Sequence, residues 1–175
     1  DHWYDEVWDF KEGFAVVQDY NKGYNFINRD GKEICDRWYA DVWHFKYGFA
    51  YVEDKNKGCN FINRDGKEIC DRWYDYVNSF SEGFADVKDK DKGWTFINHE
   101  GKEVFGRWYD GVGKFREGFA RVLNKDGGCN FINHDGKEIC GRCYDNVLNF
   151  SEGFGPVKDK NKGWNIVNRA GKEIS

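Results

Sequence analysis

Apolar and polar residues alternate along this chain in short stretches, and polar, glycine-containing turns separate these stretches. In Phe84-Ala85-Asp86-Val87-Lys88 the two kinds alternate as they do in a half-buried strand. Further β-prone stretches lie at residues 73–80, 94–97 and 102–105, with turns at 81–83, 89–93 and 98–101. Turns at this spacing, about every eight to ten residues, leave no room for helices. The pattern predicts an all-β protein with about three or four short antiparallel strands in each such unit.

The whole pattern recurs every 35 residues. Eleven of the 35 positions carry the same residue in all five units, among them those of Tyr4, Phe10 and Gly13. The units are residues 1–35, 36–70, 71–105, 106–140 and 141–175. They predict a single repeat array over residues 1–175. One unit cannot hide its aromatic face from water alone, so the recurring Tyr, Val and Phe positions are assigned to a core shared between neighbours.

Two architectures fit this repeat. An open, twisted β-solenoid or superhelical array is preferred, because 35 residues are few for a propeller blade of about 40–45 residues. The alternative is a small five-bladed β-propeller, which would close the units into a ring. The first and last units carry no polar cap, so an open array predicts end-to-end association of copies, including fibres.

Composition removes several classes of function. Charged residues at 33% and a mean hydropathy of -0.89 favour disorder, but aromatic residues at 19% do not. The net charge is -4 and no basic block occurs, so we expect no nucleic-acid partner. No apolar run approaches the roughly 18 residues of a membrane span. Methionine is absent, even at position 1, which indicates a processed N-terminus or an excerpt of a longer chain.

The repeat resembles a known family. The residues that carry the likeness are Tyr74-Asp75-x-Val77-x-x-Phe80-x-Glu82-Gly83-Phe84-Ala85-x-Val87, Lys92-Gly93-Trp94-x-Phe96-Ile97-Asn98 and Gly101-Lys102-Glu103. This order and spacing resembles the bacterial WG (KWG-type) repeat along the whole chain. The resemblance implies a β-rich fold, a variable number of copies and an exported, extracellular or cell-surface protein, and it supplies no catalytic residues. Cys59 and Cys129 depart from the aromatic residue expected after the third-strand glycine.

The six cysteines follow the repeat phase. If residues 63–66 form a four-residue hairpin loop, Ile62 faces Lys67 and Cys59 faces Cys70. Facing residues of a hairpin lie close enough to form a disulfide. The same count pairs Cys129 with Cys140 in the fourth unit. Two cysteines remain as free thiols or inter-chain links, Cys35 and Cys143. A disulfide framework is typical of oxidising compartments.

No catalytic, cofactor or metal site stands out. The four histidines occupy scattered positions, and Glu33 and its counterparts follow Gly-Lys on a hairpin, where an exposed Lys–Glu edge guards against strand aggregation. We therefore expect a protein that is not an enzyme and has no cofactor. Four tryptophans share one repeat position, and they belong either to the inter-repeat core or to an aromatic binding surface: Trp3, Trp38, Trp73 and Trp108.

These observations favour a non-enzymatic, exported repeat scaffold. Its expected partners are other proteins or further copies of the chain, because a repetitive surface adds many weak contacts together. The alternative is a carbohydrate-binding, lectin-like module that stacks glycans on the tryptophan column.

Overall fold

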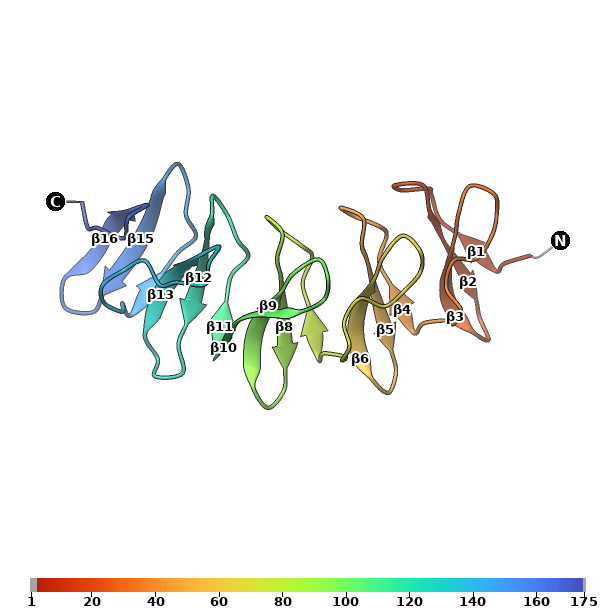
Figure 1. Ribbon diagram of the computed structural model, residues 1–175, viewed down its shortest axis with the longest axis horizontal. Coiled ribbons are helices and arrows are strands. Elements are labelled where there is room, and N and C mark those ends of the chain that lie inside the picture. Colours follow the sequence, from red (N-terminus) through yellow and green to blue (C-terminus); the bar gives the residue numbers. More distant parts are fainter. Residues whose placement is uncertain (1–2, 175) are drawn as a thin grey trace. The chain divides into compact units, whose positions relative to one another are not determined.

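The computed structural model describes residues 3–174 (Figure 1). These residues form sixteen β-strands and no helix, in five small antiparallel sheets, one for each repeat. None of these sheets closes on itself. The prediction of an all-β fold built from tandem repeats is confirmed.

Contacts divide the chain into two compact units. Unit 1 comprises Asp1–Ser79 and His99–Lys102, and unit 2 comprises Phe80–Asn98 and Glu103–Ser175. The strands of unit 1 are β1 (Glu6–Val7), β2 (Ala15–Asp19), β3 (Gly23–Ile27), β4 (Asp41–Val42), β5 (Ala50–Asp54), β6 (Gly58–Ile62) and β7 (Tyr76–Val77). Those of unit 2 are β8 (Ala85–Asp89), β9 (Gly93–Ile97), β10 (Glu103–Tyr109), β11 (Gly111–Val112), β12 (Phe119–Leu123), β13 (Cys129–Asn133), β14 (Asn146–Val147), β15 (Phe154–Asp159) and β16 (Gly163–Asn168). The choice between an open array and a ring depends on how the two units are placed, and it stays a prediction.

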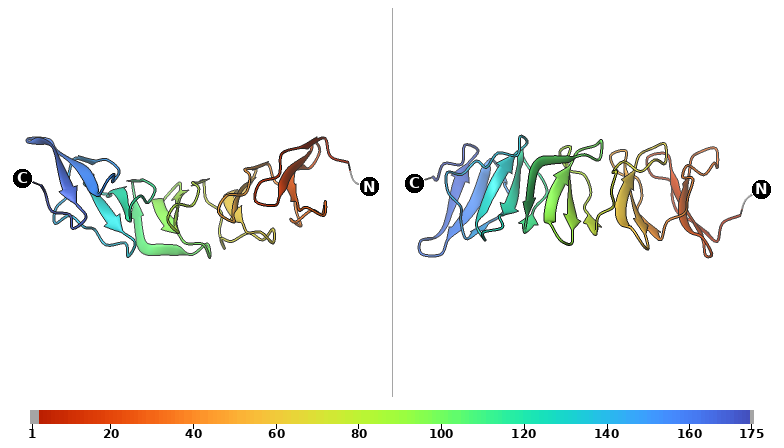
Figure 2. Two further views of the ribbon diagram at one scale, coloured as in Figure 1. Left: turned by 90° about the horizontal axis from the view of Figure 1, so that it is seen from above. Right: turned by 60° about the horizontal axis from the view of Figure 1, so that its bottom comes forward.

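Each repeat is an antiparallel meander of a short strand and a hairpin. In the first repeat the order is β1-β2-β3, with Val7 opposite Val17 and Val17 opposite Asn25. The predicted strand over residues 73–80 is reduced to the two residues of β7. A fourth strand forms only as β10, which pairs with β9 through a register shift between Val104 and Tyr109 and is drawn as a bent strand in Figure 2.

The hairpin after the third strand is one residue longer than predicted. Ile62 bridges to Glu68 and not to Lys67, and Asn63 donates its backbone N–H to the Lys67 carbonyl. The Asn63 side chain drives this difference, because its Oδ1 accepts the backbone N–H groups of Asp65 and Lys67 and so stabilises a five-residue loop.

This register bears on the predicted disulfides. Cys59 lies opposite Tyr74, and Cys129 lies opposite Tyr144. The register that placed Cys59 against Cys70, and Cys129 against Cys140, is therefore wrong. The disulfide pairing itself stays a prediction, and all six cysteines are free thiols in this structure.

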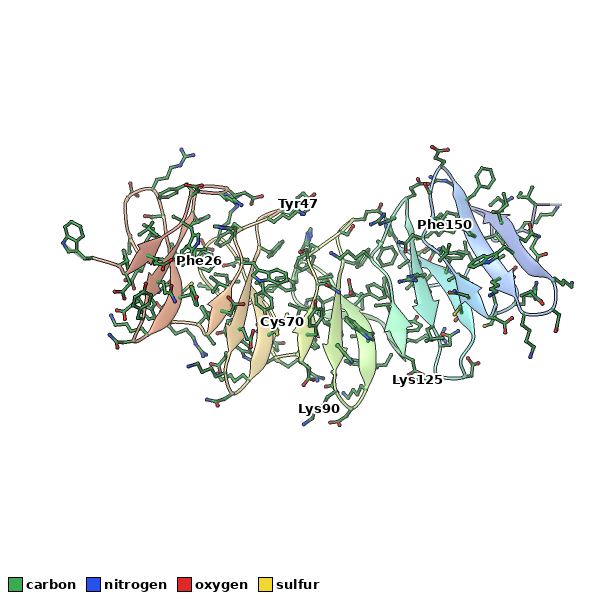
Figure 3. All side chains as sticks on the ribbon, turned by 180° about the vertical axis from the view of Figure 1, so that it is seen from behind. Phe26, Tyr47, Cys70, Lys90, Lys125 and Phe150 are labelled. Carbon is green, nitrogen blue, oxygen red and sulfur yellow. The ribbon has the colours of Figure 1, made fainter. Side chains whose placement is uncertain are left out.

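Three phenylalanines join each repeat to the next within a unit. In unit 1, the rings of Phe14 and Phe26 lie 4.4 and 5.1 Å from that of Phe45 in the following repeat. The same trio recurs twice in unit 2, as Phe84, Phe96 and Phe115 and as Phe119, Phe131 and Phe150. Figure 3 labels Phe26 and Phe150 among the packed side chains of their units. The predicted assignment of the recurring phenylalanines to an inter-repeat core is confirmed inside each unit.

Candidate binding surface

The repeats differ strongly at four positions in or directly beside the first two strands of each meander, and equally at position 9, which lies outside these strands. We call positions 6, 8, 16 and 18 of the repeat the variable strip. In repeats one to five these positions read Glu-Trp-Val-Gln, Asp-Trp-Tyr-Glu, Tyr-Asn-Asp-Lys, Gly-Gly-Arg-Leu and Asn-Leu-Pro-Lys. Positions 7 and 17, which alternate with them along the same strands, are valine in every repeat.

Pairing places the strip on one face of the sheet. In the second repeat Asp41 lies opposite Glu53, and Trp43 donates its backbone N–H to the Tyr51 carbonyl. Side chains alternate between the two faces of a strand. The strip therefore lies on the face opposite to Val42 and Val52, whose side chains are buried. Most strip side chains are exposed or half-buried; the exceptions are Val16 and Asp86.

In unit 1 the strip is acidic and aromatic. The Trp43 ring is 48% exposed and stacks on Tyr51 at 4.7 Å. Asp41 and Glu53 face each other across β4 and β5, and like charges in such a pair repel each other. Glu6 adds a third carboxylate at the corresponding place in the first repeat. We call Glu6, Asp41 and Glu53 the acidic strip.

In unit 2 the strip is basic. Its exposed charges are Lys88, Arg121 and Lys158, one in each of the three successive repeats. Lys88 and Lys158 each lie 5.8 Å from the centre of a tryptophan ring on the neighbouring strand. We call these three residues the basic strip. The two units thus carry opposite charge within the strip, with position 18 occupied by Glu53 in unit 1 and by Lys88 and Lys158 in unit 2.

Glu33 and its counterparts in the other repeats are the carboxylates to consider for catalysis. They are held by structural contacts. The hydroxyl groups of Tyr4 and Tyr144 donate to Glu33 and Glu173. Arg142 pairs with Glu173 at 2.8 Å and with Asp159 at 2.8 Å. The predicted role of this glutamate column as an exposed edge guard is thus incomplete, since these carboxylates also tie the start of each repeat to its end.

The tryptophan column is partly covered. Trp38, Trp73 and Trp108 are half-buried, and a lysine ammonium lies over each ring at 5.2 to 5.5 Å. Trp3 is 89% exposed. Trp38 borders an open groove of about 470 Å³ with Tyr20 and Asn21. A lysine thus lies over one face of each of these three rings, and glycan binding by this column stays a prediction.

The cysteines are mostly buried. Cys143 is exposed and the other five are buried. Burial raises the pKa of the Cys35 thiol to about 12 and that of Cys140 to about 11, which disfavours the nucleophilic thiolate. Among residues 3–174 no group of three potential metal-ligating side chains lies together, and no helix in that part of the chain is long and apolar enough to cross a membrane.

The variable strip escaped prediction. The residue differences are visible in the sequence, but only the pairing of the first two strands brings positions 6 and 18, and positions 8 and 16, side by side on one face. A comparison of the five repeats position by position is the signal that could have found it.

Several solved structures resemble the chain at low similarity. The computationally designed Ika8 protein is 15% identical with a TM-score of 0.49, over 97% of this chain and 60% of Ika8. The designed Ika4 protein is 16% identical with a TM-score of 0.43, over 71% of this chain and 87% of Ika4. BamB from Moraxella catarrhalis is 10% identical with a TM-score of 0.47, over 95% of this chain and 58% of BamB. This chain therefore spans about 60% of the length of Ika8 and of BamB. At these scores the likenesses carry no argument.

No curated protein matches the chain. The pattern described as "WG containing repeat" matches it five times, at residues 4–22, 26–57, 61–92, 94–128 and 131–164. Each segment ends near the start of the third strand of a meander, the next begins inside that strand, and together the segments cover most of the sequence. The chain belongs to the WG repeat family.

Proposed function

We propose that the protein is a non-enzymatic scaffold that associates with further copies of itself through its variable strips. In this arrangement the acidic strip of one copy binds the basic strip of another. The observation that carries the proposal is the opposite charge of the two strips, three carboxylates in unit 1 and three cations in unit 2.

The division of the repeat into constant and variable positions supports this use. Constant positions build the core, as Val17, Val52 and Val87 do at 0% exposure. Most variable positions lie on an accessible face, where a residue can change without disturbing the packing; Val16 and Asp86 are buried. A surface of this kind can adapt its chemistry repeat by repeat, and several weak contacts then combine into a stable one.

The aromatic pair strengthens the acidic strip as a contact surface. Trp and Tyr are enriched at protein interfaces, where they bury large rigid surfaces. Trp43 keeps 48% of its surface exposed while it stacks on Tyr51. Glu53 accepts the Tyr51 hydroxyl at 2.8 Å, so its carboxylate is held at the edge of this pair, ready for a cation of the partner.

Sedimentation velocity tests the proposal. We expect self-association of the wild-type chain that weakens as salt rises from about 0.05 to 0.5 M, because exposed charges are screened. Glu53→Lys should weaken it further at low salt. Asp30→Lys is the matched control, since Asp30 is an exposed turn residue outside the strip and this substitution changes the net charge equally.

A chain that stays monomeric at low salt contradicts the proposal, as does an equal effect of Glu53→Lys and Asp30→Lys. Electron microscopy of the assembled material under non-reducing conditions then separates fibres from closed particles, and so tests end-to-end growth.

A further inference from the structure

A groove of about 210 Å³ opens between the fourth and fifth repeats, inside unit 2. Its walls include Gly111, Arg121, Leu123, Cys129, Asn146 and Val147. Gly111 lies opposite Leu123, and Leu123 lies opposite Cys129, so these three residues form one row across β11, β12 and β13.

The row that lines the groove contains no aromatic ring, as is also true of Asp41, Glu53 and Cys59 in the second repeat. At the position of Cys129, three other repeats carry Tyr24, Trp94 and Trp164. At the position of Gly111, the third repeat carries Tyr76. The fourth repeat therefore has a glycine and a small thiol where a ring stands elsewhere in the same row. A cavity of about 150 Å³ is enough to bind benzene, so a groove of 210 Å³ has room for one planar aromatic ring.

A positively charged side chain at the groove adds a second requirement for its ligand. Arg121 is exposed, and no residue among 3–174 forms an ion pair or hydrogen bond with its guanidinium. Asp110 pairs with Lys125 at 2.8 Å and Asp145 accepts the Lys160 backbone N–H at 2.7 Å, and neither carboxylate pairs with Arg121. An arginine guanidinium can pair with a carboxylate through two parallel hydrogen bonds.

We propose that this groove binds an aromatic ring that bears a carboxylate. The ring lies in the row of Gly111, Leu123 and Cys129, in the place that tryptophan takes in the third and fifth repeats. The carboxylate pairs with Arg121. The ligand is either a small aromatic acid or the C-terminal aromatic residue of a polypeptide, and both present the same chemistry. Arg121 also belongs to the basic strip, so a ligand carboxylate and the acidic strip of another copy compete for it; the site goes beyond the proposed self-association because it takes a small aromatic ligand.

Isothermal titration calorimetry with indole-3-acetate tests the site. The titration uses the Glu53→Lys background, whose substitution lies in unit 1, so that self-association and ligand binding succeed or fail separately. We expect binding to the parent chain, at least about tenfold weaker binding after Arg121→Gln, and no binding after Gly111→Tyr. Neutral 3-methylindole should bind the parent no better than it binds Arg121→Gln.

Gly111→Tyr is compatible with the backbone. Gly111 has no positive φ, and an added Cβ would lie 3.6 Å from the Leu123 Cβ, an ordinary contact. Cys129→Trp fills the same row from the other side and replaces Gly111→Tyr if that variant fails to fold. Gly141→Ala is the control, because an added Cβ there meets nothing within 4 Å.

A peptide that ends in tryptophan, with a free or an amidated carboxyl, forms the second arm of the experiment. Binding of indole-3-acetate without binding of the peptide identifies a small-molecule site. Binding of the peptide with a free carboxyl identifies a polypeptide C-terminus. Both outcomes support the proposal. Failure of the parent to bind either probe overturns it. Undiminished binding by a folded groove-filling variant overturns it too.

Discussion

The Glu12 carboxylate accepts the backbone N–H of Gly48, one repeat further along unit 1, at 2.9 Å. It also accepts the Tyr47 N–H at 2.8 Å and pairs with Arg64 at 3.1 Å. Glu117 makes the equivalent contacts in unit 2, with the N–H groups of Glu152 and Gly153. Within each unit, a carboxylate in the turn of one repeat thus binds the backbone of the corresponding turn in the next repeat.

We expect Glu12→Gln to destabilise unit 1 by about 1 kcal/mol, which is less than a buried charged hydrogen bond contributes, because the site is partly exposed. Thermal unfolding followed by circular dichroism measures this. Asp30→Asn, at a turn residue outside this contact, is the matched control and should change the melting temperature little. Equal melting temperatures for Glu12→Gln and wild type would contradict the assignment.

The same carboxylates predict a loss of stability in acid. Hydrogen bonds from the backbone N–H groups of Gly48 and Gly153 lower the pKa of Glu12 and of Glu117 below the usual 4.5. A lowered pKa in the folded state gives stability that is complete above the unfolded pKa and is lost as pH falls through the folded one. Melting temperatures between pH 6 and 3 should therefore fall below about pH 4.5, and less so in a Glu12→Gln, Glu117→Gln double variant. Identical pH profiles for the double variant and wild type would count against these contacts.

Tyrosines at one repeat position should respond differently to loss of the hydroxyl. The Tyr144 hydroxyl donates to Glu173 at 2.9 Å, whereas the Tyr109 hydroxyl is buried without a partner. Around Tyr109, the corresponding Glu138 instead accepts Arg107 and Asn124. We expect Tyr144→Phe to cost about 1 kcal/mol and Tyr109→Phe to be neutral or stabilising, since it removes an unsatisfied polar group. Chemical denaturation of both variants measures the difference, and a larger cost for Tyr109→Phe would refute it.

Gly31 and Gly66 occupy the same repeat position. Comparing their substitutions distinguishes the effect of backbone strain from that of contact between repeats. Gly31 and Gly66 have φ of +74° and +73°, so alanine is strained at both. An added Cβ at Gly31 meets nothing within 4 Å, whereas at Gly66 it would collide with the Ile34 carbonyl of the preceding repeat. We expect Gly66→Ala to destabilise the protein by at least about 2 kcal/mol more than Gly31→Ala. Equal effects in urea unfolding would mean that the two repeats do not meet at this point.

The sequence predicted the two hairpin strands of each repeat and the shared core well, because a 35-residue period and glycine turns constrain them directly, but it made the first strand too long. Phe26 and Phe45 pack as expected of constant aromatic positions. The hairpin register was missed, because it depends on the two backbone N–H groups that the Asn63 Oδ1 accepts and not on the residue count. The strip was missed for a similar reason. Only the strand pairing shows that Asp41 and Glu53, both carboxylates, lie opposite each other.

The most direct test of strip-to-strip association is a mixing experiment with two charge-reversed chains. Glu53→Lys removes a contact from the acidic strip, and Lys158→Glu removes one from the basic strip. Each variant alone should associate more weakly than wild type. A mixture retains one intact acidic strip and one intact basic strip, and it also allows the new lysine to meet the new glutamate. Sedimentation velocity at low salt should therefore show restored association in the equimolar mixture. A mixture no better associated than either variant alone would contradict the account.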